Sequence, residues 1–231
     1  MTQNKEYRQP RFQRPPGATE ILLVRHGESR AATPDNPFPL VDGQGDPELH
    51  ENGRFQAERV GERLRHQPID AIYATKLRRT RETATPLSQH LGINIEIDPD
   101  LHEVHLGEWE GGLFRIKAHE GDPIYLQMHE EQRWDVIPGA ESWQQINERV
   151  TRGLARIHAK HPDQLVVVVV HGGIIGHILA HATGAAPFSF GGADNGSISH
   201  IVMVEGRIVV RRFNDASHIS ESVEYSAALP T

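Results

Sequence analysis

The chain alternates between short apolar runs and longer segments in which apolar residues recur every three or four positions. The runs are typical of buried strands, and the spaced pattern is typical of helices that pack one face on a sheet. The predicted strands are 20–25, 70–74, 93–97, 166–170, 197–204 and 207–213, and the predicted helices are 52–67, 77–91, 141–160 and 174–183. This alternation predicts a three-layer α/β fold, with a mostly parallel central sheet and helices on both faces.

Two internal segments break this pattern. Residues 29–51 hold several prolines and glycines without any period, which predicts a long loop beside a strand end. Residues 101–140 are glycine-rich at first and then mix polar and apolar positions, which predicts a partly helical insertion that covers a site as a lid, at about 107–140. We expect a flexible arm at 1–19, one domain at 20–218 and a C-terminal tail at 219–231.

Composition narrows the class of protein. The 231 residues include no cysteine, which excludes disulfides, thiolate metal sites and thiol nucleophiles. The formal net charge of −7 argues against nonspecific binding to nucleic acid or to an anionic membrane. No apolar run is long enough to span a bilayer, and the first residues do not resemble a signal peptide. We therefore expect a soluble cytoplasmic protein.

Polar groups gather where the predicted strands end. The apolar runs at 20–25 and 166–170 are followed by His26 and His171, each succeeded by glycine, and Arg25 closes the first run. Carboxyl ends of neighbouring parallel strands meet at one edge of a sheet, so both imidazoles are expected at one place. Arg78 and Arg79 lie at a predicted helix start, where cations are unfavourable unless an anion binds there. One of these two arginines is expected to be a solvated surface residue.

A carboxyl group completes the set. Glu103 lies beside glycines and Trp109, where partial burial would raise its pKa and suit it to general acid catalysis, although an ordinary surface glutamate explains the spacing equally well. Two imidazoles, arginines and one carboxyl group fit phosphoryl transfer through a phosphohistidine. The imidazole attacks phosphorus, the arginines stabilise the charge, and the carboxyl group protonates the leaving oxygen and then activates water.

Several separated motifs resemble the histidine phosphatase, or phosphoglycerate mutase-like, superfamily. They lie at 23–29, 46–49, 72–84, 101–111, 170–173, 195–198 and 213–218, so the resemblance covers about 20–218. It implies that His26 is the phosphorylated nucleophile, that Arg25 and Arg79 bind phosphate, that Glu103 is the general acid and that His171 is the second histidine of the site. Arg78 is then left to the surface.

The sequence departs from the family pattern at Ala32 and at His50, a loop position that is commonly threonine, and it favours one branch elsewhere. Ala32 occupies a position that is often asparagine, so one hydrogen bond to the phosphate or the nucleophile is expected to be missing. Gly173 and the Leu101-His102-Glu103 motif resemble phosphatases more than mutases. We therefore predict a metal-independent phosphomonoester hydrolase, with a phosphoglycerate mutase as the alternative. A non-catalytic phosphate-binding protein and a metallohydrolase using His102, His105 and His171 are lesser alternatives.

The loops are expected to supply the substrate contacts. Further phosphate or substrate contacts are predicted at Ser29, Gln44, Gly45 and Gly172. Candidates for a second anionic group of the substrate are Arg30, Arg115, Lys117 and Arg133, from the segments 30–48 and 111–139. The expected partner is a small phosphorylated metabolite, without a cofactor, a nucleic acid or a membrane. Pairing of the 197–213 hairpin between two copies in a homodimer is left open.

Overall fold

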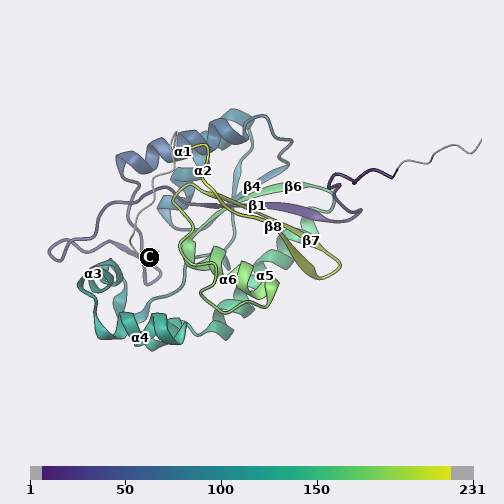
Figure 1. The fold of residues 1–231 in the computed structure, drawn as a ribbon. Helices are drawn as coiled ribbons and strands as arrows, with labels where there is room; N and C mark the ends of the chain where they lie inside the picture. The colour runs from purple at the N-terminus through teal and green to yellow at the C-terminus, as the bar shows by residue number, and fades with distance from the viewer. Residues whose placement is uncertain (1–6, 220–231) are drawn as a thin grey trace, which may run out of the picture.

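The computed structural model describes residues 7–219 and contains a six-stranded sheet in the order β5-β4-β6-β1-β7-β8 (Figure 1). Its strands are β1 (Thr19–Arg25), β4 (Ala71–Ala74), β5 (Ile95–Ile97), β6 (Leu165–Val170), β7 (Ile198–Val204) and β8 (Arg207–Asp215). Strands β5, β4, β6 and β1 are parallel, whereas β7 is antiparallel to both β1 and β8. The predicted mostly parallel α/β sheet is therefore confirmed, and each predicted strand is present with small differences at its ends.

The register of the central strands aligns their carboxyl ends. Val24 of β1 and Ala74 of β4 both pair with Val169 of β6. Strand β6 is a run of β-branched residues buried on both sides, as a strand with neighbours and covered faces requires. The residues that follow β1, β4 and β6 consequently begin at the same edge of the sheet.

Helices cover both faces of the sheet. Helices α1 (Glu51–Leu64) and α2 (Arg78–Leu91) lie on one face, and α5 (Trp143–Lys160) and α6 (Gly172–Thr183) lie on the other (Figure 1). Alternate residues of β1 point into two separate cores, with Leu23 on the α5–α6 side and Val24 on the α1–α2 side. The sheet is thus the middle of three layers.

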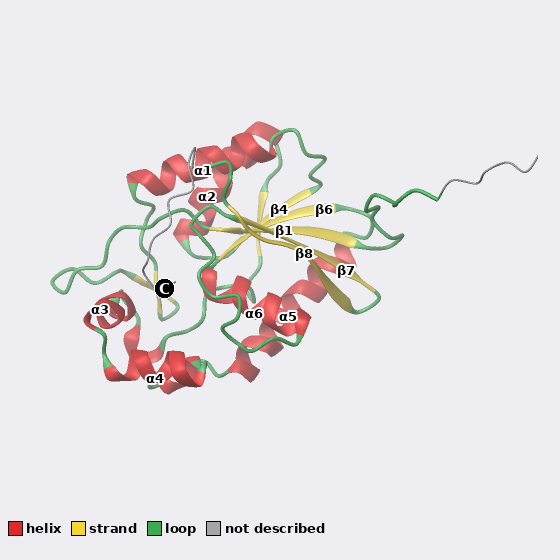
Figure 2. Ribbon diagram, viewed as in Figure 1, coloured by secondary structure: helices red, strands yellow, loops and turns green. Residues whose placement is uncertain are grey.

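The segment 107–140, called the lid below, is partly helical as expected (Figure 2). It contains two short 3-10 turns and two helices: η1 (Gly107–Trp109), α3 (Leu113–Glu120), α4 (Pro123–Glu131) and η2 (Trp134–Val136). Trp109, Tyr125, Met128 and Ile137 form a small core of its own. The lid therefore packs as a separate layer beside the ends of the strands.

The segment 29–51, predicted as a long loop, holds a short hairpin that the sequence did not indicate. It contains a two-stranded hairpin of β2 (Leu40–Val41) and β3 (Gln44–Gly45), and Ser29 bridges Leu49 at its base. Each hairpin strand has two residues, which is too short to produce a readable alternation of apolar and polar positions. The hairpin fixes Gln44 and Gly45 close to the strand ends.

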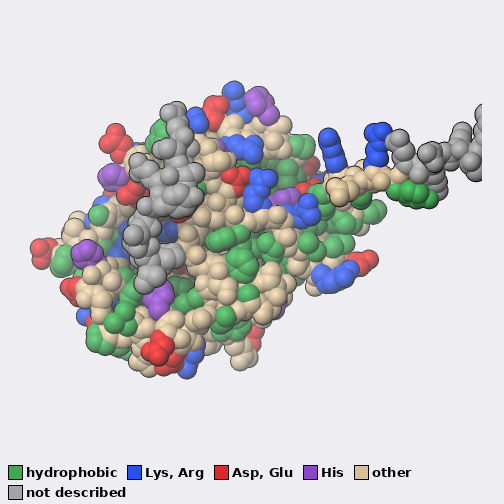
Figure 3. Space-filling view, in the orientation of Figure 1, with side chains coloured by type: hydrophobic (Ala, Val, Ile, Leu, Met, Phe, Trp, Pro, Cys, Tyr) green, Lys and Arg blue, Asp and Glu red, His purple; other side chains and the backbone are tan. Residues whose placement is uncertain are grey.

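The described residues include little of the expected N-terminal arm and C-terminal tail that could test those predictions. Residues 7–18 form no helix or strand, and nearly all of the predicted tail at 219–231 lies outside the described residues. The division into arm, domain and tail therefore stays a prediction. On the face in Figure 3, acidic and basic side chains of the described residues are interspersed. Among these residues, no helix is both long and apolar enough to cross a membrane.

Candidate active site

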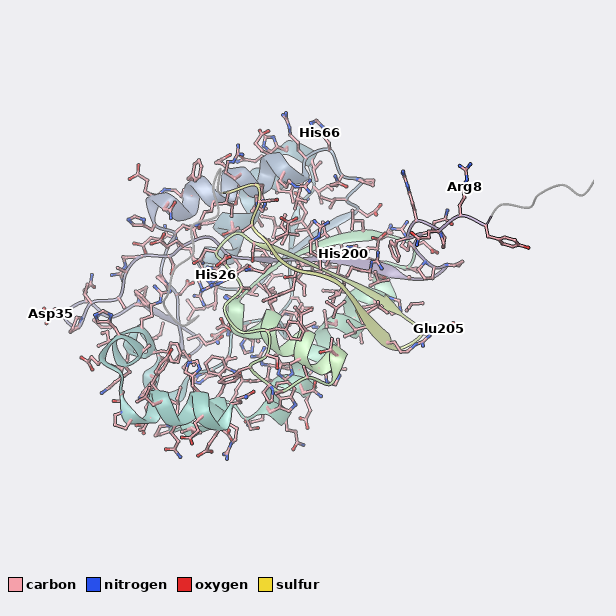
Figure 4. All side chains as sticks on the ribbon, in the orientation of Figure 1. Arg8, His26, Asp35, His66, His200 and Glu205 are labelled. Atoms are coloured by element: carbon pink, nitrogen blue, oxygen red, sulfur yellow. The ribbon has the colours of Figure 1, made fainter. Side chains whose placement is uncertain are left out.

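The two histidines predicted to converge lie side by side at the ends of β1 and β6. The ring centroids of His26 and His171 are 5.2 Å apart, with the rings tilted by 64°. Both side chains are buried. Figure 4 shows His26 at the end of the sheet, between the helices α1 and α2 and the lid. The shared edge of the parallel strands accounts for this convergence.

Hydrogen bonds define the tautomer of His26. Its Nδ1 lies 2.7 Å from the Gly27 carbonyl oxygen, which only accepts, so Nδ1 carries the proton. Its Nε2 then holds a lone pair, and the Arg79 Nε donates to it at 3.2 Å. Burial, followed by the charges of Arg79 and Arg25, holds the pKa of His26 well below its usual value. His26 is therefore a neutral imidazole with its Nε2 lone pair ready to attack an electrophile.

A close backbone crossing fixes the turn after His26. A Cβ on Gly27 would lie 2.4 Å from the Gly53 carbonyl oxygen, and a Cβ on Gly53 would lie 1.9 Å from the Glu28 carbonyl oxygen. Glycine at both positions allows the start of α1 to press against this turn. The Asn195 side chain also donates to the His26 carbonyl oxygen at 2.8 Å. His26 and the turn after it are thus held by contacts from α1 and from Asn195.

Three guanidinium groups meet beside His26 without a carboxylate partner. Arg79 donates to the Gly45 carbonyl oxygen at 2.8 Å, and Arg25 donates to the Ala193 carbonyl oxygen. Arg115, from α3, donates to Ser29 Oγ at 2.7 Å. In residues 7–219 none of the three forms an ion pair, whereas Arg78 is exposed and pairs with Glu82. The cluster is suited to an anion.

The electrostatics of these arginines agree with an anion site. Burial lowers the pKa of Arg25 and of Arg79 from its ordinary value. Arg115 is exposed as a residue, but desolvation of its guanidinium group, with the charges of Arg79 and Arg25, lowers its pKa to about 10. Each group remains a cation at neutral pH. Like charges placed together this closely are stabilised when an anion binds between them.

Glu103 is half-buried in the site, and its carboxyl group is desolvated there. Its carboxylate accepts from the Val104 N–H at 3.0 Å and from the Gly173 N–H, at the start of α6, at 3.4 Å. Burial raises the pKa of Glu103, and the nearby charges of Arg79 and Arg25 only partly oppose this. A Cβ on Gly173 would lie 2.7 Å from Glu103 Oε1, so a side chain there would displace the carboxyl group. A buried carboxyl group of raised pKa can donate a proton near neutral pH.

An arginine that the sequence analysis did not single out holds the Glu103 segment. Arg149 of α5 donates to the carbonyl oxygens of Asp100, His102 and Glu103, at 2.8, 2.7 and 3.0 Å. It also makes a bidentate ion pair with Glu141, whose Oε2 accepts from the backbone N–H of residue 105. The sequence feature that could have indicated this role is the position of Arg149 on the apolar face of the predicted helix.

His171 retains an unpaired ring nitrogen. Its Nε2 lies 3.1 Å from Thr75 Oγ1, at the end of β4, which sequence reasoning did not include in the site. Within the described part of the chain, His171 Nδ1 and Arg25 Nε are buried without a partner. Burial, then the neighbouring charges of Arg79 and His26, holds the pKa of His171 well below its usual value. Unpaired buried polar atoms at a candidate site are open to a ligand.

The site opens into a cavity of about 1170 Å³. Its walls include nearly all residues that the sequence analysis selected: Arg25, His26, Ser29, Gln44, Gly45, Arg79, Glu103 and Gly172. His171 lies just behind them and is fully buried. Gln44 contributes a further contact, because its side-chain amide donates to the Glu103 carbonyl oxygen at 2.8 Å.

Of the candidates for a second anionic group, Arg115 lines the cavity, and the others pair with acidic side chains. Arg30, Lys117 and Arg133 lie 3.5, 2.9 and 3.0 Å from the carboxylates of Glu48, Asp122 and Asp135.

The alternative metal site at residues 102, 105 and 171 is not assembled, since residues 7–219 contain no cluster of three or more His, Asp or Glu that could hold a metal ion. The methyl group of Ala32 lies beside the lid, close to Gly112.

Comparison with known proteins agrees with this geometry. The family model of the histidine phosphatase superfamily (branch 1) matches residues 21–216. Phosphoglycerate mutase-like protein 4 of Arabidopsis thaliana is 35% identical over 208 residues, which cover 88% of each chain. Metal-independent phosphoserine phosphatase of the same plant is 32% identical over 206 residues, covering 87% of this chain and 84% of its own.

A solved structure shows the same similarity in three dimensions. The mycobacterial glucosyl-3-phosphoglycerate phosphatase superposes with a TM-score of 0.71 at 28% identity, over 86% of this chain and all of its own. The prediction of a phosphatase of this superfamily is confirmed at the level of family and enzyme class. With the site at the strand ends and the match over 21–216, the chain belongs to the histidine phosphatase superfamily, branch 1.

Proposed function

We propose that this protein hydrolyses phosphomonoesters through a phosphohistidine intermediate at His26 Nε2. The observation that carries the proposal is the state of this atom: the Gly27 carbonyl oxygen holds the proton on Nδ1, and Arg79 faces the lone pair on Nε2. A neutral imidazole beside three guanidinium groups that lack carboxylate partners is arranged to attack a bound phosphate ester.

In the first half-reaction, His26 Nε2 attacks phosphorus and the bond between phosphorus and the ester oxygen breaks. The carboxyl proton of Glu103 passes to that oxygen, so the alcohol leaves neutral and Glu103 becomes a carboxylate. Burial of Glu103, which raises its pKa, supports this acid role. The phosphorylated imidazole keeps its Nδ1 proton on the Gly27 carbonyl oxygen.

In the second half-reaction, the Glu103 carboxylate takes a proton from water as the water oxygen attacks phosphorus. The bond between phosphorus and Nε2 breaks, which restores the neutral imidazole and releases inorganic phosphate. The residues end as they began, with Glu103 protonated and His26 neutral. Arg25, Arg79 and the unpaired Nδ1 of His171 are suited to stabilise the phosphoryl oxygens in both steps, and one such donor commonly contributes about 100- to 1000-fold in kcat.

Trapping the intermediate tests this function directly. A phosphate ester labelled with ³²P should leave an acid-labile, base-stable label on the wild-type protein, and His26→Ala should abolish both the label and phosphate release. Turnover is expected to persist in excess chelator, because no step uses a metal. Label on His26→Ala, or undiminished turnover by this variant, would overturn the assignment.

The second candidate is the mutase reaction, which is suggested by the name of one relative, phosphoglycerate mutase-like protein 4. A mutase must exclude water from the phosphohistidine and hold a second anionic group of its substrate. Once Arg25 and Arg79 hold the phosphoryl group, Arg115 is the one arginine or lysine among the described residues that lines the cavity and is left for such a group. The other candidates are paired with carboxylates, so the geometry favours hydrolysis. Incubation with 3-phosphoglycerate separates the two reactions: release of inorganic phosphate supports the hydrolase, and formation of 2-phosphoglycerate supports the mutase.

A further inference from the structure

We propose that this site takes phosphomonoesters with a bulky aromatic leaving group that carries no second anionic group. The leaving group would lie in the part of the cavity that is lined by the lid and by residues 187–189. This inference rests on the proposed hydrolase function and names its substrate class.

Aromatic rings from three segments form the walls of this part of the cavity, which we call the aromatic compartment. It is lined by Phe114, Tyr125 and Trp134 of the lid, Trp143 at the start of α5 and Phe188 after α6. The ring centroids of Trp134 and Phe188 lie 5.0 Å apart, and those of Phe114 and Trp134 lie 5.9 Å apart. Apart from Tyr125, these rings are only partly buried and so keep surface for a ligand.

Charge separates the two ends of the cavity. Among the described residues, the arginine and lysine side chains that line it are Arg25, Arg79 and Arg115, all of which lie near the phosphate end. In the compartment, burial lowers the pKa of His129 and that of His177, the latter to about 4, so both imidazoles are neutral at pH 7. A substrate carboxylate would therefore find no cation among the aromatic rings.

Size leads to the same conclusion. Binding sites for drug-sized ligands are usually about 300–1000 Å³, and this cavity has about 1170 Å³. A phosphoryl group and a three-carbon alcohol fill only the end beside His26. They would leave Trp134 and Phe188 facing water, whereas an aromatic leaving group would remove that apolar surface from water.

The names of the relatives suggest a different substrate class from the one proposed here. One is named a phosphoserine phosphatase and another a glucosyl-3-phosphoglycerate phosphatase, and both names imply a carboxylate in the substrate. Among the described residues, Arg115 at the phosphate end is the one cavity-lining cation left for such a carboxylate, and the aromatic compartment offers none. The aromatic compartment instead predicts a preference for uncharged rings.

A series of alkyl phosphates tests the preference, in which propyl phosphate matches the naphthyl ester in leaving-group acidity and O-phosphoserine is the carboxylated ester. The wild-type protein should hydrolyse 3-(2-naphthyl)propyl phosphate with a kcat/KM at least about tenfold above those of propyl phosphate and O-phosphoserine, since burial of one aromatic ring is commonly worth tenfold or more. A kcat/KM for O-phosphoserine equal to or above that for the naphthyl ester would overturn the proposal.

Variants locate the effect. Phe188→Ala should lower kcat/KM for the naphthyl ester about tenfold and leave kcat/KM for propyl phosphate within about twofold. Phe188→Leu keeps much of the apolar volume and should give a smaller loss. It serves as the test variant if Phe188→Ala does not fold. Phe55→Ala, at an exposed ring on α1, is the matched control. An equal loss on both substrates would mean that Phe188 only packs the lid.

The failure of this inference is distinguishable from failure of the hydrolase function. Phosphate release that depends on His26 but favours small or carboxylated esters refutes the aromatic compartment alone. Absence of His26-dependent release from every ester refutes the hydrolase function itself.

Discussion

Replacing Arg149 by methionine tests how the fold holds the Glu103 segment. The Arg149 side chain is 7% exposed and that of Glu141 is 16% exposed, and the two form a bidentate ion pair. Methionine keeps much of the apolar volume but leaves the Glu141 carboxylate without its cation. It also removes the donor from the carbonyl oxygens of Asp100, His102 and Glu103.

The structure sets the magnitude. Removing one partner of a buried ion pair costs about 3–5 kcal/mol. Glu141 retains some contact with solvent and one backbone N–H, so the lower end applies. We expect Arg149→Met to lower the free energy of unfolding by about 3 kcal/mol. The double variant Arg149→Met/Glu141→Leu removes the stranded charge as well and should recover about 1–2 kcal/mol of this loss.

Urea denaturation followed by circular dichroism measures both values, and Arg152→Met is the control. Arg152 lies on the same helix and pairs with Asp100, but its side chain is 59% exposed, so its loss should change stability by less than about 1 kcal/mol. The reasoning fails if Arg149→Met is no less stable than Arg152→Met, or if the double variant is less stable than Arg149→Met.

Three further predictions concern the chemistry. Glu103→Gln should slow esters of alkyl alcohols more than 4-nitrophenyl phosphate, because a good leaving group needs little protonation; equal losses on both would exclude the acid role. Gly173→Ala should lower kcat at least about tenfold in steady-state assays by displacing the Glu103 carboxyl group, whereas unchanged kcat would show that the carboxyl group adapts. The fold lowers the pKa values of His26 and His171, so the unfolded chain binds more protons than the folded chain below about pH 6.5. The free energy of unfolding should therefore decrease as pH falls below that value, and the decrease should be smaller in His171→Asn. An equal pH dependence of the two proteins in urea titrations would contradict this.

The strand ends were predictable because they depend on local pattern and one rule of topology. Apolar runs identified β1 and β6, and parallel pairing placed His26 and His171 at one edge. The distinction between Arg78 and Arg79 depended on the family resemblance. The structure agrees with it: Arg79 faces His26, and Arg78 pairs with Glu82 at the surface.

Contacts between segments that are distant in the sequence could not be predicted from local hydrophobic patterns. Whether Arg115 would reach Ser29 depends on how the lid packs, and no periodicity encodes that placement. Thr75 acts through a side-chain contact to His171 between different strands. Arg149 had a local signal, a cation among apolar positions, but its carbonyl partners lie in a loop distant in the sequence.

The site draws its parts from two sources that can change independently. The groups assigned to bond making and breaking stand on the strand ends and their adjoining turns, whereas most rings assigned to the alcohol belong to the inserted segment at 107–140. Substitutions in that segment can therefore diversify the compounds accepted without disturbing the reacting atoms. Arg115 is the exception, since it connects the insertion to Ser29 in the loop after His26, so the packing of the insertion also determines how much positive charge lies beside His26.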